Sequence, residues 1–236
     1  MKERIDKVLL ELKLISTRSQ AKMLIEKGDV YCNDIQVKKP GQLVSPQDKF
    51  EIRTDIYVSR GAFKLIKALD EFKINLEGKV IADIGASTGG FTQVCLERGA
   101  SKIFCIDVGH GQLHESLKNN PKVINLEGVH ILDLDLTQDV DICVVDLSFI
   151  SFLKVVKKIG SLTKGPIIAL IKPQFEAGVE LMGKKAVLSK ELSQKVFENV
   201  LLELKKMNFK IKKIIPSPIL GKEGNTEFLI ELYSES

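Results

Sequence analysis

VIADIGASTGGFT, at residues 80–92, is the stretch that decides the fold. A short apolar run ends at Asp83, and a turn built on Gly85 and Gly89–Gly90 leads into a helical pattern. A strand that delivers its carboxyl end to small residues and a helix N-terminus is how α/β domains hold a nucleotide-like cofactor. Because the spacing is not the G-x-G-x-x-G of dinucleotide enzymes, the loop is looser and could admit an amino-acid-bearing cofactor. A plain glycine turn is the alternative.

A second strand pattern supports the cofactor interpretation. The run Ala100–Val108 ends near Asp107, 22 residues after Gly85. A carboxylate at this offset can accept both hydroxyls of an adenosine ribose, so NAD and S-adenosylmethionine fit equally. A turn or helix-capping role for Asp107 is the alternative.

The composition indicates an ordinary globular protein. The 236 residues allow one large or two modest domains with a core, and they are 44% hydrophobic and 28% charged. A net charge of +4 permits nucleic acid as a partner without demanding it. Tryptophan is absent, so no aromatic platform for base stacking is obvious.

Several classes of protein are disfavoured. The four cysteines have no C-x-x-C spacing, which indicates reduced thiols in a cytoplasmic protein. His110 and His114 have no further ligands nearby, so no metal is expected. The N-terminus lacks the apolar region of a signal peptide, and no apolar run approaches the ~18 residues that would span a membrane. We therefore expect no stable membrane insertion.

Residues 1–53 have the pattern of a small α+β domain. Helical spacing begins near Ile5, and a second helix is predicted to start after Ser16 or Thr17 and to end at Gly28. Short strands follow, with a turn at Asn33–Asp34.

Basic side chains gather on this domain, and Arg18 and Lys22 share one helix face. Such a cluster suits a phosphate backbone better than base-specific recognition, although a solvated charged face is the alternative. The predicted RNA-binding residues are Arg4, Arg18, Lys22, Lys38, Lys39 and Arg60.

This first segment resembles the S4 RNA-binding domain. The matching stretches are RIDKVL at 4–9, SQAKMLIEKGDV at 19–30 and CND at 32–34, with Pro40 and Asp48. Asp34 stands where such a domain often has Gly, a change that left-handed turn geometry tolerates. The resemblance implies binding to structured RNA.

After a polar linker at 54–59, the pattern changes to apolar strands that alternate with helices over residues 60–236. Strands are predicted at 79–84, 102–108, 122–126, 141–147, 166–171, 210–216 and 227–232. Helices are predicted at 62–71, 90–98, 151–159 and 190–207, with a weaker one near 112–118. This alternation predicts an α/β fold with a mostly parallel sheet covered on both faces.

Four charged residues of this second domain break the local pattern. Lys64 lies in an apolar helical stretch, and Glu227 opens the last strand. Asp146 and Lys172 end core strands, at the edge of the sheet where ligands of open α/β folds bind. A structural ion pair is the alternative role for any one of them.

The motifs of the second domain resemble the TlyA family, whose members are described as hemolysins and as ribosomal RNA 2′-O-ribose methyltransferases. They are SRGAFKL at 59–65, DIGASTGGFT at 83–92, DVGHGQL at 107–113, DLSFIS at 146–151, KPQFE at 172–176 and GNTEFL at 224–229. The resemblance implies an S4 domain joined to an FtsJ-like, Rossmann-like methyltransferase domain with a seven-stranded sheet.

The same resemblance implies the site residues. The family's catalytic tetrad corresponds to Lys64, Asp146, Lys172 and Glu227. The implied contacts to S-adenosylmethionine are Asp83, Gly85, Ala86, Ser87, Gly89, Gly90, Phe91, Asp107, Val108 and Asp133. The segment GVHILD at 128–133 lacks an expected Asn-Ala-Arg, which weakens the assignment of Asp133.

We hypothesise that Lys172, in its neutral form, removes the proton of a ribose 2′-hydroxyl while the site aligns oxygen, methyl carbon and sulfur. Asp146 would orient Lys172, and Lys64 and Glu227 would hold the target ribose and phosphate. No metal is needed, and ribosomal RNA or a ribosomal subunit is the expected partner. The alternatives are a membrane-lytic hemolysin, a non-catalytic RNA-binding protein and an NAD-dependent dehydrogenase, which the glycine spacing disfavours.

Overall fold

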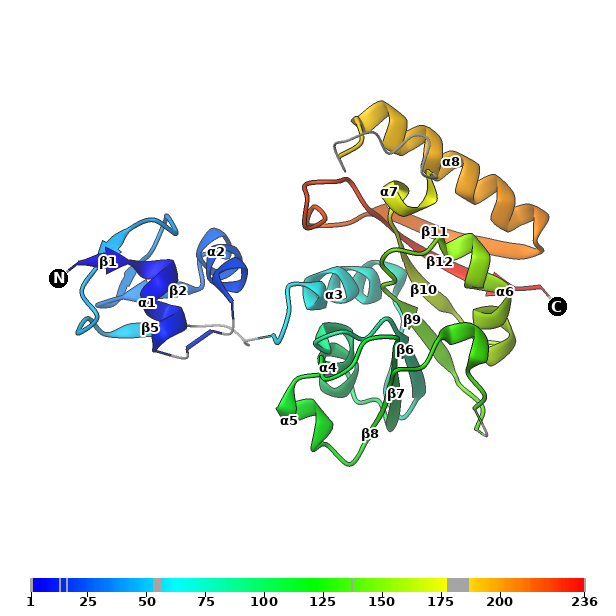
Figure 1. Ribbon diagram of the computed structural model, residues 1–236, viewed down its shortest axis with the longest axis horizontal. Coiled ribbons are helices and arrows are strands. Elements are labelled where there is room, and N and C mark those ends of the chain that lie inside the picture. Colours follow the sequence, from blue (N-terminus) through cyan, green and yellow to red (C-terminus); the bar gives the residue numbers. More distant parts are fainter. Residues whose placement is uncertain are drawn as a thin grey trace. The chain divides into compact units, whose positions relative to one another are not determined.

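The computed structural model describes residues 2–12, 14–15, 17–52, 57–136, 138–177 and 187–235. The chain divides into two compact units, Met1–Arg60 and Gly61–Ser236. The predicted linker at 54–59 falls partly outside the described residues, which resume at Tyr57. Figure 1 shows the two units, each of which has its own core.

The N-terminal unit packs two helices on short antiparallel strands. Its elements are β1 (Glu3–Arg4), α1 (Ile5–Glu11), α2 (Arg18–Lys27), β2 (Val30–Cys32), β3 (Ile35–Gln36), β4 (Leu43–Val44) and β5 (Phe50–Ile52). Strand β1 pairs with β4, and β2 lies between β3 and β5. The Thr17 hydroxyl accepts a hydrogen bond from Gln20 N, so Thr17 is the N-cap, and Gly28 ends α2 with φ of +88°. Ser16, the other predicted cap, lies outside the described residues.

The C-terminal unit is a seven-stranded sheet with the order β11-β12-β10-β9-β6-β7-β8. Strand β12 is antiparallel to both neighbours, and the other neighbouring pairs are parallel. The strands are β6 (Val80–Ile84), β7 (Lys102–Asp107), β8 (Val123–Glu127), β9 (Ile142–Val145), β10 (Ile167–Ile171), β11 (Phe209–Pro216) and β12 (Phe228–Ser234). The predicted α/β class with a mostly parallel sheet is confirmed.

Helices cover both faces of this sheet (Figure 1). They are α3 (Gly61–Phe72), α4 (Gly90–Glu97), α5 (Glu115–Lys118), α6 (Phe152–Leu162), α7 (Pro173–Glu176) and α8 (Lys190–Lys206), with a 3₁₀ turn η1 at Ile131–Asp133. Alternate strand residues such as Ala82, Ile84 and Val145 pack with α6 and α8 in one core. The opposite face carries Asp83 and Cys105, which contact Thr92 of α4.

The weaker helix predicted near 112–118 is only one turn, α5. The Glu127 carboxylate accepts hydrogen bonds from the backbone N–H groups of Gln112 and Leu113, at 2.6 and 3.0 Å, and so holds these residues outside the helix. Helix α7 was not predicted, because four residues after a proline carry no helical periodicity. No helix in the described part of the chain is long and apolar enough to cross a membrane.

Candidate active site

The four charged residues singled out in the sequence lie around one edge of the sheet. Asp146 directly follows β9, and Lys172 directly follows β10. Glu227 immediately precedes antiparallel β12, and its neighbour Phe228 pairs with Ile171 at the end of β10. Glu227 therefore stands beside Lys172 at the same edge, and Lys64 reaches it from the first turn of α3.

Lys172 and Asp146 form a close ion pair. Lys172 Nζ lies 2.6 Å from Asp146 Oδ1, and the two side chains are 10% and 20% exposed. Lys172 Nζ also donates a hydrogen bond to Ser148 Oγ at 2.8 Å. The Asp146 N–H donates to Ile84 O, which fixes the residue to the end of β6. The ammonium group is thus held by two partners from the loop after β9.

Lys64 and Glu227 form a second pair that is more deeply buried. Their Nζ and Oε2 atoms are 2.6 Å apart, and the side chains are 6% and 3% exposed. Gln174 Nε2, two residues beyond Lys172, donates to Glu227 Oε1 at 3.5 Å. This amide joins the second pair to the segment that carries the first. Burying two such pairs is costly in solvation, so the arrangement is better explained by chemistry than by stability.

A cavity of about 560 Å³ opens beside the first pair. It is lined by residues from the ends of β6, β7 and β9 and the loops that follow, among them Gly85, Ser87, Asp107, Val108 and Asp146. Gly85 has φ of +86°, and a Cβ atom there would lie 2.6 Å from the carbonyl oxygen of Asp146. Glycine at this position therefore lets the loop after β6 and the loop after β9, which begins at Asp146, approach each other.

Asp107 is prepared to accept hydrogen bonds from a ligand in this cavity. Its Oδ2 accepts from the Ser87 N–H and its Oδ1 from the Gly109 N–H, both at 2.8 Å. Each carboxylate oxygen keeps a free lone pair for a hydroxyl group. The cavity volume, the glycine at the loop and the oriented carboxylate fit a nucleoside-bearing cofactor such as S-adenosylmethionine.

The other predicted cofactor residues do not line the cavity. Ala86, Gly90 and Phe91 are buried in the loop and in α4, where they support the turn. Gly89 packs against Leu113 and Leu117, and with φ of +95° it needs to be glycine. Asp133 is exposed on η1. His130 and Ile131 line the cavity in its place, and the sequence analysis did not identify them.

Asp83 is fully buried beneath the loop, where its Oδ2 accepts a hydrogen bond from the Thr92 hydroxyl at 2.6 Å. Burial raises the pKa of Asp83 to about 7, and the negative charges of Asp146 and Asp107 act in the same direction. Asp83 therefore holds the end of β6 to α4 through Thr92, and its buried carboxyl group is not exposed to a ligand in the cavity.

The raised pKa of Asp83 predicts a pH-dependent stability difference between the wild type and Asp83→Asn. The folded wild type holds a proton that the unfolded chain has lost, so its stability falls as the pH rises from about 4 to 7. The amide cannot ionise, so the variant should gain up to about 1.4 kcal/mol per pH unit relative to the wild type. Urea unfolding of both proteins at pH 4, 5.5, 7 and 8 measures this. A difference that is constant over this range contradicts the prediction.

The predicted RNA-binding residues are spread over the N-terminal unit and the residue that ends it. Arg4 and Arg18 both form ion pairs with the buried Asp6 carboxylate, at nitrogen–oxygen distances of 3.0 and 2.8 Å. These contacts lower the pKa of Asp6 to about 2, and the hydrogen bond from Arg4 has the largest effect. The Arg4 and Arg18 side chains remain more than half exposed. Lys22 Nζ lies 3.8 Å from Glu26 Oε1. Lys38 and Lys39 are exposed, and Arg60 is half-buried in the turn before α3.

One residue at the rim of the cavity was missed. Phe149 is 91% exposed and has φ of +65°, a left-handed conformation that is unusual for an aromatic residue. It lines the cavity, and its ring centroid is 5.2 Å from that of Phe175. An exposed aromatic ring at the rim of the cavity that Asp146 also lines is a candidate binding platform.

Comparisons with known proteins agree with this architecture. A model of the S4 domain matches residues 3–50, and a model of the FtsJ-like methyltransferases matches residues 57–233. The 16S/23S rRNA (cytidine-2′-O)-methyltransferase TlyA of Mycobacterium tuberculosis is 36% identical over 242 residues, which cover 99% of this chain and 90% of the relative. The chain belongs to the TlyA family.

Other TlyA-family relatives and structures extend the comparison. Hemolysin A of Brachyspira hyodysenteriae is 35% identical, covering 96% of this chain and 98% of its own. A solved structure from Streptococcus thermophilus with a provisional hemolysin name is 34% identical, with a TM-score of 0.74 over 100% of this chain and 90% of that one. S-adenosylmethionine is the cofactor of the FtsJ-like methyltransferases, the class that residues 57–233 match.

Proposed function

We propose that this TlyA-family protein transfers a methyl group from S-adenosylmethionine to a ribose 2′-hydroxyl of ribosomal RNA in the cytoplasm. Relatives from Mycobacterium tuberculosis and Campylobacter jejuni are named for this activity on 16S/23S and 23S rRNA. The observation that carries the proposal is the Lys172–Asp146 pair, 2.6 Å across, at the edge of the cavity that fits the cofactor.

When bound, the cofactor supplies a methyl group on a positively charged sulfur. Gly85 and Ser87 would approach it through the backbone, and Asp107 would accept hydrogen bonds from its ribose hydroxyls. Val108, which is 62% exposed, would cover an apolar part of it. These residues bind the cofactor and fix its orientation.

Lys172 acts as the general base in this proposal. A ribose 2′-hydroxyl is a weak nucleophile, so its proton must leave as the new oxygen–carbon bond forms. Lys172, neutral in the substrate complex, accepts this proton on the lone pair of Nζ and becomes an ammonium group. Asp146 and Ser148 fix the position of that nitrogen through contacts of 2.6 and 2.8 Å. The alignment that they provide contributes to the rate along with the proton transfer.

Lys64 and Glu227 position the target nucleotide. Gln174 Nε2 donates to Glu227 Oε1, and Gln174 lies in α7, whose N-cap is Lys172, so one short segment contacts both pairs. The Lys64 ammonium is charge-matched to a phosphate oxygen, and Glu227 can accept a hydrogen bond from a ribose hydroxyl.

Phe149 provides a stacking surface for the target base. Stacking of a base on an aromatic side chain contributes about 1–3 kcal/mol, so Phe149→Ala should lower the rate at limiting RNA about tenfold or more. Cofactor affinity should stay within about threefold, because Phe149 lies at the rim of the cavity and, at 91% exposed, is not packed around its interior. Steady-state methylation assays measure the first quantity and calorimetry the second. Leu202→Ala on α8 is the matched control, since Leu202 is also exposed, at 55%. Equal rates for Phe149→Ala and this control contradict the stacking role.

The N-terminal unit would bind the RNA through phosphate contacts. Replacing exposed Lys38 and Lys39 by Glu should weaken RNA affinity and reduce its salt dependence by about one unit of slope for each lost phosphate contact. Filter binding at several salt concentrations measures both. The control is Lys154→Glu with Lys157→Glu, which makes the same charge change on α6. If both double variants lose affinity equally, the predicted RNA face is wrong.

The proposal is tested by incubating the protein with tritiated S-adenosylmethionine and separated ribosomal subunits. We expect radioactivity in the RNA of at least one subunit and none in ribosomal protein. Label that is found only in protein, or in neither fraction, contradicts the proposed function.

A further inference from the structure

The segments that follow β9 and β10 contact each other at three successive places. Lys172 and Asp146 form an ion pair at the start of both segments. Farther along, the rings of Phe149 and Phe175 have centroids 5.2 Å apart. Beyond them, Glu176 accepts two hydrogen bonds from the residues at which α6 begins. The loop at 146–151 is therefore joined to α7 at its start, middle and end, and Glu176 makes the last of these contacts.

Glu176 takes the place of the usual cap of α6. Its Oε2 accepts a hydrogen bond from the Ser151 hydroxyl at 2.6 Å, and its Oε1 accepts one from the Phe152 N–H at 2.7 Å. Ser151 is the N-cap residue, but its hydroxyl makes no capping hydrogen bond to its own helix. At α8, by contrast, the N-cap Ser189 accepts a hydrogen bond from the Leu192 N–H at 3.2 Å, as N-cap serines usually do. The start of α6 thus depends on a side chain from α7.

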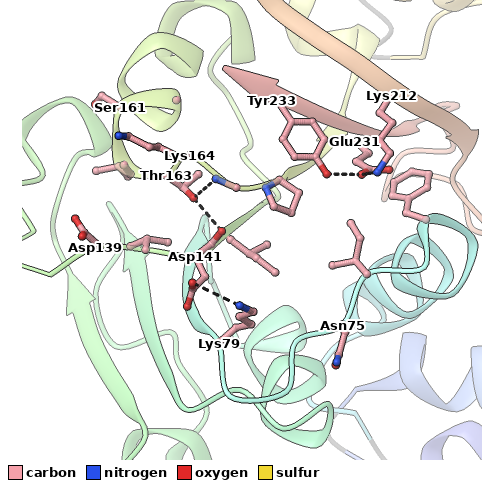
Figure 2. Close-up of a pocket in the computed structure, with 18 of the residues that line it drawn as sticks. Asn75, Lys79, Asp139, Asp141, Ser161, Thr163, Lys164, Lys212, Glu231 and Tyr233 are labelled. Carbon is pink, nitrogen blue, oxygen red and sulfur yellow. Dashed lines mark hydrogen bonds and ion pairs between the residues drawn. The ribbon is translucent and has the colours of Figure 1, made fainter. Parts of the chain in front are cut away.

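Helix α6 is also held in place by contacts that do not involve Glu176. At its far end the Thr163 hydroxyl donates to Asp141 O and accepts from the Gly165 N–H, both at 2.9 Å. This end lies beside a second cavity, of about 710 Å³, at the opposite edge of the sheet (Figure 2). Phe152 and Val156 of the helix are buried in the core. What Glu176 adds is therefore a link between the loop at 146–151 and α7.

Phe149, in the middle of this loop, has a conformation that needs support. Its φ of +65° is unfavourable for an aromatic residue, and such a conformation persists where the surrounding contacts impose it. The side chain is 91% exposed, so the protein core does not hold it. The contacts that do are the Phe175 ring and, two residues after Phe149, the bond from Ser151 to Glu176.

We propose that Glu176 is a positioning residue for the RNA substrate. By fixing the end of the loop to α7, it holds Phe149 at the rim of the cofactor cavity in the orientation that stacks on the target base. Glu176 itself does not contact the substrate. The inference rests on the proposed function and adds to it the residue that sets the stacking surface.

The test is a double-mutant cycle of Glu176→Ala and Phe149→Ala, measured as the rate of methyl transfer at limiting RNA. Each single variant should lose about tenfold or more, the loss expected when one base no longer stacks. The double variant should be within about threefold of Glu176→Ala, because a loop that is not fixed no longer presents Phe149. Residues that act independently would instead multiply their losses.

A conservative variant and a matched control separate positioning from stability. In Glu176→Gln the amide oxygen can accept from the Phe152 N–H and the NH₂ group can donate to the Ser151 hydroxyl, so most of the rate should be restored. Thr163→Val removes the hydroxyl that anchors the other end of the same helix, and its rate should stay within about twofold of the wild type. Thermal unfolding by circular dichroism reports whether each variant is folded.

The proposal is overturned if Glu176→Ala is as active as Thr163→Val, or if the two losses multiply in the double variant. Should Glu176→Ala fail to fold, Ser151→Ala takes its place in the cycle. It removes one of the two hydrogen bonds, so it should lose about fivefold, again without adding to the loss in Phe149→Ala.

Filter binding of ribosomal RNA to the same variants keeps this inference separate from the proposed function. If the wild type transfers no methyl group, the proposed function fails. The same cycle of RNA affinities then decides whether Glu176 acts through Phe149, with multiplied losses again counting against it.

Discussion

Lys172→Ala should reduce methyl transfer by about a thousandfold, because removal of a general base typically costs 10²–10⁴ in rate. In the proposed mechanism the lysine nitrogen accepts the 2′-hydroxyl proton, and this nitrogen is 2.6 Å from Asp146 Oδ1 and 2.8 Å from Ser148 Oγ. A single-turnover assay with saturating RNA and cofactor measures the chemical step directly.

Cofactor affinity is the control for this variant. Lys172 does not line the cofactor cavity, so calorimetry should give a dissociation constant within a few-fold of the wild type. Lys172→Arg should be as inactive as the alanine variant, because a guanidinium keeps the positive charge but does not accept a proton at neutral pH. Unchanged turnover in either variant removes Lys172 from the role of base.

Lys64→Ala should be the most destabilising single change in the active site. It leaves the Glu227 carboxylate, which is 3% exposed, without its partner at 2.6 Å. Removing one partner of a buried ion pair lowers the free energy of unfolding by about 3–5 kcal/mol. Urea unfolding monitored by circular dichroism measures the loss.

The double variant Lys64→Met with Glu227→Leu separates stability from function. Replacing a buried ion pair by apolar residues of similar volume is often neutral or stabilising, so this protein should unfold near the wild-type midpoint. It should nevertheless be inactive if the pair positions the target nucleotide. Activity close to that of the wild type would mean that the two residues form only a structural pair.

The sequence predicted the succession of strands and loops along the chain better than it predicted individual side-chain contacts. The run before Asp83, the glycines and the Asp107 offset were sufficient to predict strand, loop and strand around a cavity, because each depends on residues near one another in the chain. Lys64 and Glu227 are 163 positions apart, yet both broke an apolar pattern, and this unexplained polarity is the signal that identified them.

What the sequence did not predict depends on side-chain packing. No local pattern indicates that Asp6 binds both Arg4 and Arg18, or that Gln174 joins the two ion pairs. Phe149 looked like an ordinary apolar residue after a strand, and only its left-handed backbone and its exposure make it a candidate. Glu231 sits within an apolar strand, and its buried position at the second cavity could not be inferred from that pattern.

The central claim, that this site methylates a ribose 2′-hydroxyl, is tested most directly by chemical analysis of the labelled product. After the reaction with ribosomal subunits, the RNA is digested to nucleosides and separated by liquid chromatography with mass spectrometry. We expect the transferred methyl group on the ribose oxygen of one nucleoside with the wild type, and its absence with Lys172→Ala. A methyl group on a base, or a 2′-O-methyl product made equally well by Lys172→Ala, contradicts the account.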